Sequence, residues 1–504
     1  MNDKRAPQAM SRRGLRNMQR DRRGFLTLIG GTGAALLAAA CGGNSTSNSN
    51  SKPSGAATTA ATRAAAASSS ATAASTSTSA AAAVNTAPAT PVKVSTVTYY
   101  GGDNAPAEVD WHKKFVADFH AAFPQYQAEG TEYTTADEAV KLQTALASNS
   151  PPDLLYRDSY ALLPTFWEQG FLAPVNDVMD DIYKLVGGKD TVVGVERFTV
   201  PSGDVFGVPY AGAPRVWWFR QDLLQQAGLT PPAGHWDWNF MLKAVKAIHN
   251  PPNVYGAGLP LGRNPGIEYT LGAFILGNGG HFVSQDLNDV LFDSPEVREA
   301  VDVAKELAQY VPPDATGWAP NDVVTALVKG YIGMTAYTGR PFSAIVDQNP
   351  ALVGKMSNSL VPYNKAPSSF GGLNAHGIFK AKNIAGAKEL AKFSLRKEQV
   401  ISYMLVTPGT YSAAIPAYGD DPSYTGSALL KQYDPKMAAT VTESPKYFGD
   451  FFKEGPAWKN NPKSGALSAS NFLVEVLQRV TVGKESTQSA VTWGAGQIRD
   501  IMKG

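Results

Sequence analysis

The sequence predicts an α/β protein with two compact domains, and three observations lead to that prediction. At 504 residues the chain is longer than one hydrophobic core ordinarily supports. From Lys93 onward, short apolar runs alternate with helical patterns, which is typical of βαβ units around a parallel sheet. A content of 10% aromatic and 17% charged residues is that of an ordinary globular protein.

The first elements of this alternation are readable in order. Residues 94–100 are strand-like and end at Gly101-Gly102-Asp103. A helix follows, because four aromatic side chains repeat at four-residue spacing before Pro124: Trp111, Phe115, Phe119 and Phe123. Residues 141–148 then indicate a helix, residues 153–156 a buried strand and residues 162–170 a further helix. Ligands in open α/β sheets bind beyond the carboxyl ends of the strands, so the loops after these strands are the first candidate site.

Charge and cysteine content exclude several classes of protein. The formal net charge is +2, but the first 41 residues carry eight Lys or Arg against two Asp, so the remainder carries −4. The basic charge therefore belongs to a targeting segment, and nothing in the body predicts a nucleic-acid partner. A single cysteine excludes an intrachain disulfide and a cysteine-based zinc site. We expect no metal and no cofactor.

Residues 1–40 are predicted to be a signal peptide. Arg22 and Arg23 stand directly before an apolar stretch at 28–40 that is too short to span a bilayer. The paired arginines resemble a twin-arginine export signal, which implies folding before export; the alternative is an ordinary signal peptide with a basic beginning.

Residues 37–42, Leu-Ala-Ala-Ala-Cys-Gly, resemble a bacterial lipobox, in which the cysteine is acylated and becomes the new N-terminus. Ala38 departs from the more usual leucine. We expect lipidation at Cys41; the alternative is a lone apolar cysteine in a discarded segment. Residues 41–92 are then predicted to be a disordered tether, because they are rich in Ser, Thr and Ala and offer few large apolar side chains to bury.

Short motifs follow one another along the body: FHAAFP at 119–124, LQTALAS at 142–148, PDLL at 152–155, QGFLAPV at 169–175, FGVPY at 206–210, WFRQDLLQQAGL at 218–229 and ALVKGYIGM at 326–334. In their order and spacing they resemble the family 1 extracellular solute-binding proteins of ABC importers, the group that includes maltose-binding protein. The resemblance covers nearly all of the chain from Val94.

This resemblance implies a periplasmic-binding-protein fold, with two α/β lobes, a hinge of crossing segments and a ligand cleft between the lobes. On this map lobe one holds residues 93–209 and 373–410, and lobe two holds residues 213–370 and 411–504. The implied partners are a small-molecule ligand, the permease subunits and, through the lipid anchor, the extracytoplasmic face of the bacterial cell membrane; we expect a monomer.

Sugar sites combine aromatic platforms with carboxylates, amides and arginines. In lobe one the resemblance and the strand ends point to Tyr100, Asp103, Arg157 and Asp158. Asp103 is alternatively a helix N-terminal residue favoured by the macrodipole, and Arg157 alternatively only pairs with Asp158. Tyr210 stands in the first crossing, where an aromatic side chain is expected to face the cleft.

In lobe two, Trp217 and Trp218 are adjacent on a strand, so only one of them can line the site, and Trp217 is the candidate. Tyr269 matches the position of an aromatic contact in the maltose-type proteins. The family's "G.W" tryptophan is missing from 337–342, so Arg340 or Phe342 is expected to replace it. Trp318 on the preceding loop is a further candidate platform, and the alternative is that it belongs to the core. That replacement leaves a non-sugar polar solute open. Asn374 and His376, which follow the return crossing, are candidate polar contacts.

These features predict a lipid-anchored binding subunit of an ABC importer that carries a mono- or oligosaccharide. A surface glycan-binding or sensing protein is an alternative. We do not expect an enzyme, because the local motifs of serine hydrolases, zinc proteases and P-loop proteins are absent from the sequence. A secreted glycosidase remains the least favoured alternative, since its paired carboxylates act across a fold and leave no local motif.

Overall fold

A computed structural model describes residues 94–503 apart from 103–105, 134, 159–161 and 264–265. The predicted signal peptide, Cys41, the tether and Asp103 lie outside the described residues. None of the described helices is both long and apolar enough to cross a membrane.

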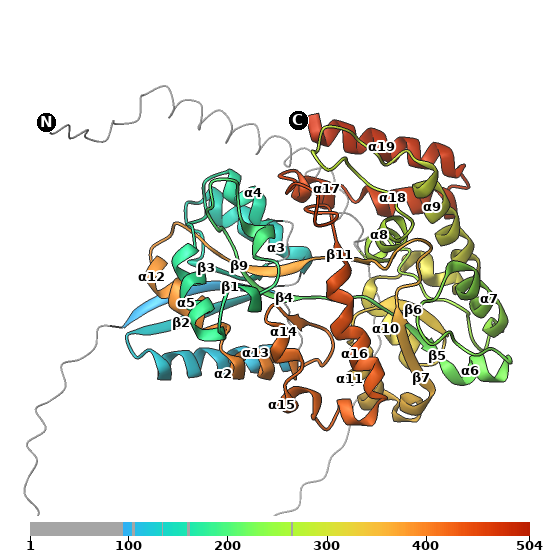
Figure 1. Cartoon of the computed structure of the whole chain (residues 1–504), viewed down its shortest axis with the longest axis horizontal. Helices are drawn as coiled ribbons and strands as arrows, with labels where there is room; N and C mark the ends of the chain where they lie inside the picture. The colour runs from blue at the N-terminus through green and yellow to red at the C-terminus, as the bar shows by residue number, and fades with distance from the viewer. Residues whose placement is uncertain (1–93, 103–105, 134, 159–161, 264–265, 504) are drawn as a thin grey trace, which may run out of the picture. The chain divides into compact units, whose positions relative to one another are not determined.

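Lobe one is built on a six-stranded sheet in the order β10-β4-β9-β3-β1-β2 (Figure 1). Its strands are β1 (Ser95–Gly102), β2 (Tyr126–Tyr133), β3 (Leu154–Asp158), β4 (Val208–Gly212), β9 (Leu373–Ile378) and β10 (Ser412–Ala413). Strand β1 pairs in parallel with β2 and β3, whereas β9 runs antiparallel to β3 and β4. The carboxyl ends of β1 and β3 therefore lie beside the beginning of β9.

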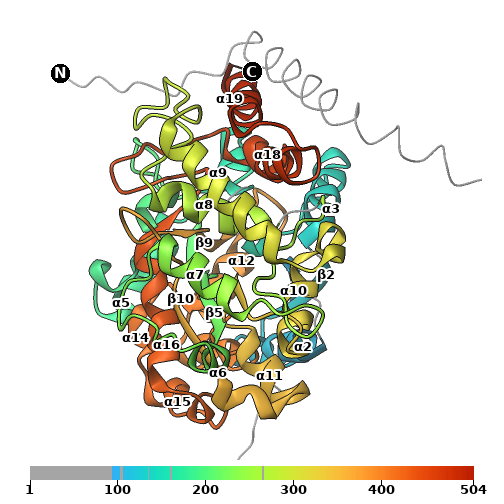
Figure 2. The same cartoon turned by 90° about the vertical axis from the view of Figure 1, so that its right-hand side faces the viewer.

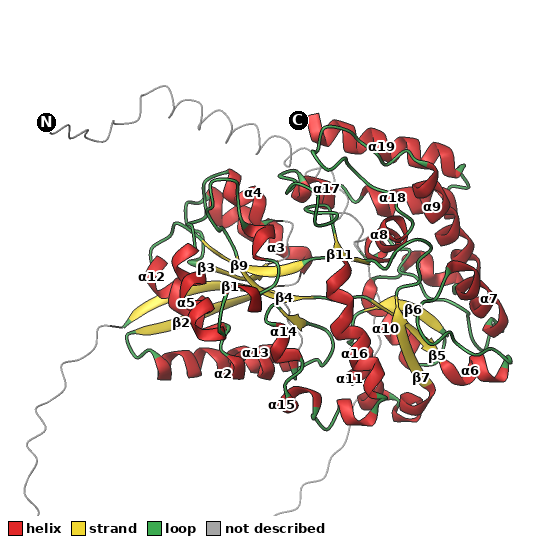
Figure 3. Ribbon diagram, viewed as in Figure 1, coloured by secondary structure: helices red, strands yellow, loops and turns green. Residues whose placement is uncertain are grey.

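Helices surround this sheet (Figure 3). They are α2 (Pro106–Ala122), α3 (Thr135–Ala147), α4 (Leu163–Glu168), α5 (Asn176–Val186), α12 (Ile384–Ser394) and α13 (Lys397–Met404). The predicted aromatic repeat lies on α2, where Phe115 and Phe119 are buried against the sheet. The Asp153 carboxylate accepts hydrogen bonds from the Thr98 amide (2.8 Å) and the Asn383 amide (2.8 Å), so it joins β1 and β3 to the start of α12.

Lobe two contains a three-stranded antiparallel sheet in the order β6-β5-β7. Its strands are β5 (Val216–Arg220), β6 (Met334–Tyr337) and β7 (Met356–Leu360). Every residue of β5 is buried, and the two adjacent tryptophans enter different apolar clusters, as the alternation of a strand requires. The indole of Trp218 donates to the Thr338 carbonyl at 2.8 Å.

Two groups of helices pack around this second sheet. The first group comprises α6 (Gln221–Gln226), α7 (Trp238–Ile248), α8 (Ile267–Gly277), α9 (Pro295–Leu307), α10 (Pro320–Val328) and α11 (Pro341–Gln348). The second group is C-terminal: α16 (Pro435–Glu443), α17 (Ser464–Ala469), α18 (Phe472–Thr481) and α19 (Thr487–Lys503). Helices α18 and α19 lie beside α9 in Figure 2, and all three contact one another.

Two short connections carry the chain between the sheets. Residues 213–215 lead from β4 to β5, and Gly371 and Gly372 lead from β8 (Ser369–Phe370) to β9. Strand β11 (Phe448–Gly449) pairs in parallel with β8.

The predicted end of lobe one at residue 410 is too early. Ser412 and Ala413 pair with Gly212 and Ala211 in the lobe-one sheet, and α14 (Pro416–Gly419) and α15 (Pro422–Thr425) contact α13. Lobe one therefore takes in the chain to about residue 425, because the antiparallel pairing of β10 holds it there.

Candidate functional site

The connection between β4 and β5 holds Arg215 by its main chain. The Arg215 amide donates to the Ser369 hydroxyl oxygen at 3.3 Å, and the Arg215 carbonyl accepts from the Ser444 hydroxyl at 2.8 Å. Both serines are buried. The two bonds come from segments far apart in sequence, so the backbone of this connection is fixed from two sides.

The Arg215 side chain lies over the ring of Tyr269. Its guanidinium carbon is 4.0 Å from the centroid of that ring and 5.8 Å from the centroid of the Tyr337 ring. Contacts of this kind are favourable because the cation faces the negative π-face of the ring. Tyr337 donates from its hydroxyl to the Asn321 Oδ1 at 3.4 Å. Arg215, Tyr269 and Tyr337 form what we call the crossing cluster.

Glu268 precedes Tyr269 on α8, and only 4% of its surface is exposed. Burial raises the pKa of its carboxyl to about 7, although Arg215 acts in the opposite direction. Burial likewise raises the pKa of the Tyr269 hydroxyl to about 12. The site therefore contains a permanent cation beside a carboxyl that is readily protonated.

The pairing of the lobe-one strands determines where the lobe-one candidate residues lie. Asn374 pairs with Ala211 of β4, three residues before Pro214, and is half-buried. Tyr100 lies near the carboxyl end of β1, opposite Leu155, and is half-buried. Asp158 ends β3 opposite Ala375, directly after Arg157. The fold thus brings Tyr100, Asn374 and the backbone of Arg157 and Asp158 to the edge of the sheet that faces the crossing.

Three candidates are corrected, because the side chains of Tyr210, His376 and Trp217 are not exposed at all. Tyr210 packs against His376 inside lobe one, with ring centroids 4.8 Å apart. The His376 Nε2 lies 2.8 Å from the Ser394 hydroxyl oxygen, a structural hydrogen bond. The prediction that these side chains face a cleft is therefore wrong for this conformation, since each points into a core.

Trp318 is also mainly structural in its placement. It is 9% exposed, belongs to an apolar cluster, and its indole donates to the Asp314 carboxylate at 3.2 Å. It precedes α10, which carries Asn321, the partner of Tyr337. Trp318 thus supports the crossing cluster from behind rather than offering an open aromatic face.

Arg340 lies in the loop between β6 and α11 and is half-buried. The Gly339 amide, immediately before it, donates to the Gly409 carbonyl at 2.9 Å. The two glycines approach so closely that a Cβ on Gly339 would lie 2.3 Å from the Gly409 carbonyl carbon and oxygen. This backbone contact positions the Arg340 loop against the end of α13.

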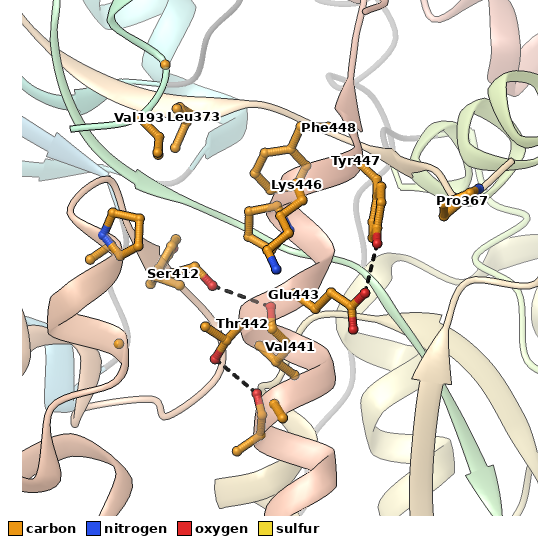
Figure 4. A pocket seen from close by; sticks show the side chains of 18 of the residues that line it. Val193, Pro367, Leu373, Ser412, Val441, Thr442, Glu443, Lys446, Tyr447 and Phe448 are labelled. Carbon is orange, nitrogen blue, oxygen red and sulfur yellow. Dashed lines mark hydrogen bonds between the residues drawn. The ribbon is translucent and has the colours of Figure 1, made fainter. Parts of the chain in front are cut away.

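A cavity of about 1310 Å³ lies on the other edge of the crossing (Figure 4). It is lined by β10 and by residues 441–448, and also by Leu373 at the start of β9. The Tyr447 hydroxyl donates to the Glu443 carboxylate at 2.8 Å along its wall. Strand β10 borders β4 on the side away from β9, whereas β3 and β1 lie on the opposite side. Neither the three residues of the crossing cluster nor any residue predicted from the sequence lines the cavity, but Ser368 and Glu443, the neighbours of the two serines that hold Arg215, do.

Among the described residues, no group of three or more His, Cys, Asp or Glu side chains is arranged to hold a metal ion. The crossing cluster offers guanidinium donors and two phenol rings, and Asn374 and Tyr100 of lobe one add a half-buried amide and a half-buried phenol, so the chemistry of this region is recognition. Sequence reasoning missed Arg215. The available signal was Ala213-Pro214-Arg215, a short proline-containing connection between two buried strands.

Two α/β sheets joined by crossing connections, with cationic and aromatic side chains gathered at the crossing, define a two-lobed ligand-binding protein. The chain belongs to the family of bacterial extracellular solute-binding proteins, whose model matches residues 105–401. This confirms the family resemblance and the two-lobed fold predicted from the sequence.

Similar proteins agree with that family. YcjN of Escherichia coli (strain K12), named as an ABC transporter periplasmic-binding protein, is 21% identical over 307 residues, which span 59% of this chain and 67% of YcjN. A binding protein of Brucella suis biovar 1 (strain 1330) is 27% identical over 203 residues, spanning 38% of this chain and only 46% of its own length.

Solved structures share the fold. An ABC transporter solute-binding protein of Thermotoga lettingae TMO, bound with α-D-tagatose, has a TM-score of 0.67 at 23% identity, covering 81% of this chain and 99% of that one. The maltose-bound MalE3 of T. maritima has a TM-score of 0.67 at 18% identity with the same coverage.

Proposed function

We propose that this chain is the lipid-anchored, extracytoplasmic solute-binding subunit of an ABC importer, and that it binds a carbohydrate between its lobes at the crossing cluster. The observation that carries the proposal is Arg215, whose main chain two serines fix at the crossing and whose guanidinium lies over the Tyr269 ring. Aromatic faces beside fixed planar donors suit the ring faces and hydroxyl edges of a sugar.

Membership of the extracellular solute-binding family supports the binding role. The sugar ligands of the Thermotoga proteins support a carbohydrate, and the name of YcjN supports an ABC transporter. The contacts we propose are Arg215, Tyr269, Tyr337, Arg340, Tyr100 and Asn374. Arg157 and Asp158 at the end of β3, and Asp103 directly after β1, complete the proposed site. Closing the lobes over the solute would bury it and present the closed form to a permease.

Thermal-shift screening tests the binding role. We expect a subset of mono- and oligosaccharides to raise the melting temperature, because a ligand that binds only the folded state stabilises it by mass action. Polyamines and amino acids serve as non-sugar controls. Stabilisation by these alone would replace carbohydrate with another polar solute, and release of shortened sugar products would favour the glycosidase alternative.

The anchor has its own test. Cells grown with a labelled fatty acid should yield a labelled, membrane-associated wild-type protein, and Cys41→Ser should yield an unlabelled protein released from the membrane. A Cys41→Ser variant that keeps both label and location would contradict lipidation. Replacing Arg22 and Arg23 with lysines tests the twin-arginine route, since export should stop only if that route is used.

Delivery to a permease is tested by reconstitution. Two integral-membrane permease subunits encoded beside this chain, with their ATPase, should hydrolyse ATP faster when the sugar-loaded protein is added. Saturable sugar binding without such stimulation would favour surface glycan binding or sensing.

A further inference from the structure

Arg215 carries a charge that the described part of the protein does not neutralise. No ion pair joins its guanidinium to a carboxylate among the described residues, and its contacts there are the Tyr269 and Tyr337 rings. By contrast, Arg197 and Arg220 each pair with an aspartate, Asp450 and Asp222. Arg215 therefore differs from Arg197 and Arg220, and resembles Arg396, a half-buried arginine that lies over the Phe123 and Phe393 rings.

Glu268 does not take the place of a partner. It is on the helix that carries Tyr269, yet it forms no ion pair with Arg215. Its burial raises the pKa of the carboxyl despite the neighbouring cation, so Glu268 is a poor counter-ion near neutral pH. The positive charge at the crossing remains available.

Closure over a neutral sugar would bury this guanidinium with no ion-pair partner among the side chains that the structure describes. Burying an unpaired charge is strongly unfavourable, whereas a carboxylate accepts two parallel hydrogen bonds from a guanidinium. The guanidinium is planar by itself, as such a bidentate contact needs, and its contacts with the Tyr269 and Tyr337 rings restrict where it can lie.

Building on the proposed function, we infer that the solute is an acidic carbohydrate, a sugar or short oligosaccharide with a carboxylate, and that Arg215 binds that carboxylate. Arg215 is then the residue that separates acidic from neutral sugars. The aromatic rings contribute to both classes, so the discrimination resides in the guanidinium.

Calorimetric titration of the full-length chain with matched sugar pairs tests this inference. Glucuronate with glucose, and galacturonate with galactose, differ at C6 alone; oligosaccharides of the same units extend the pairs, and glucose 6-phosphate tests another anion. We expect the acidic member of at least one pair to bind 10-fold or more tightly. Arg215→Gln should weaken that binding about 10- to 150-fold, the range for a hydrogen bond to a charged group, and bring the acidic-to-neutral ratio towards one.

The matched control is Arg298→Gln, which removes a surface arginine paired with Asp293 and should leave both affinities unchanged. Arg215→Lys keeps the charge without the planar fork and should retain part of the discrimination. The wild-type ratio provides a test even where Arg215→Gln does not fold.

The outcomes separate the two proposals. Equal binding of acidic and neutral members, tighter binding of the phosphate, or an Arg215→Gln effect of the same size on both members overturns the acidic-sugar inference and leaves carbohydrate binding intact. Failure of every sugar to bind, while a non-carbohydrate solute does, overturns the proposed function itself.

Discussion

Arg197 and Asp450 form a buried ion pair although they are 253 residues apart in the chain. Arg197 belongs to the 3-10 turn η2 (Val195–Phe198) of lobe one, and Asp450 follows β11, which pairs with β8 at the return crossing. The Asp450 carboxylate also accepts from the amides of Phe452 and Lys453. This pair ties the C-terminal segment to lobe one beside the crossing.

Asp450→Asn should destabilise the protein by about 3–5 kcal/mol, because it leaves the Arg197 guanidinium buried without a counter-ion. The shift in the urea unfolding midpoint measures the loss. Asp181→Asn, which breaks exposed contacts to Lys184 and Lys392, is the control and should show no comparable shift. Equal midpoint shifts in both variants would mean that the buried ion pair contributes no more to stability than the exposed contacts of Asp181.

Glu268→Gln should change how stability depends on pH. The folded pKa of about 7 lies above the ordinary glutamate pKa of 4.5, so the folded state holds the proton more tightly than the unfolded state. Wild-type stability should therefore fall as the pH rises from about 4.5 to 7 and level off above it, by an amount on the order of 3 kcal/mol. The glutamine variant should lose this decline, so its advantage over wild type grows between pH 5 and pH 8.

Urea titrations at several pH values measure that difference. Glu296→Gln removes a carboxyl whose pKa is instead lowered, chiefly by a backbone hydrogen bond, and should not produce such a gain at pH 8. A wild-type profile that is flat between pH 5 and 7 would contradict an elevated pKa at Glu268.

Gly339→Ala should destabilise the protein by roughly 1–3 kcal/mol, since its Cβ would overlap the Gly409 backbone, which has no side chain to move aside. Gly354→Ala is matched in chemistry, and nothing lies within 4 Å of its added Cβ. Thermal melts of the two variants should differ clearly. Similar melting temperatures would show that the 339–409 contact relaxes without cost.

Trp318→Ala should lower stability by about 3–5 kcal/mol, because the indole is buried and bonded to Asp314. Trp318→Phe should recover much of the loss and leave sugar affinity within about threefold of wild type, as expected for a supporting residue at the ±0.5 kcal/mol level. If Trp318→Phe instead folds normally and loses most of its affinity, the indole is a ligand platform after all.

Small-angle scattering with and without saturating solute tests the motion of the lobes. A hinged closure should reduce the radius of gyration of the wild-type chain. Identical profiles, at a solute concentration where calorimetry shows full occupancy, would contradict closure.

The sequence was sufficient for the fold, and for a physical reason. Aromatic spacing on α2 and the apolar run of β3 report local periodicity, which one stretch of chain carries by itself. The pairing of β10 with β4 joins residues about 200 apart in the chain and involves only two residues on each strand. No local sequence pattern therefore predicts it. For this reason the sequence predicts an end of lobe one at residue 410, before the strand β10 that belongs to its sheet.

The candidate site was less predictable, because exposure depends on packing partners. Tyr210 and His376 stand at the right place in the chain, but each ring turns into the core of lobe one. Tyr269 stays a predicted ligand contact, and its ring lies under the Arg215 guanidinium. Only the folded chain brings residue 215 and residue 269 together.

The two serines hold the Arg215 main chain in the connection between the two sheets. If the proposed closure rotates the lobes about this connection, its residues should move least, so we expect the Arg215 donors to stay nearly in place between the open and closed forms. A solute would therefore contact Arg215 first, and the residues on the moving lobes would contact the solute only as the lobes close. On that order of events, substitution at Arg215 should slow capture, whereas substitution at Arg340 or Tyr100 should hasten escape.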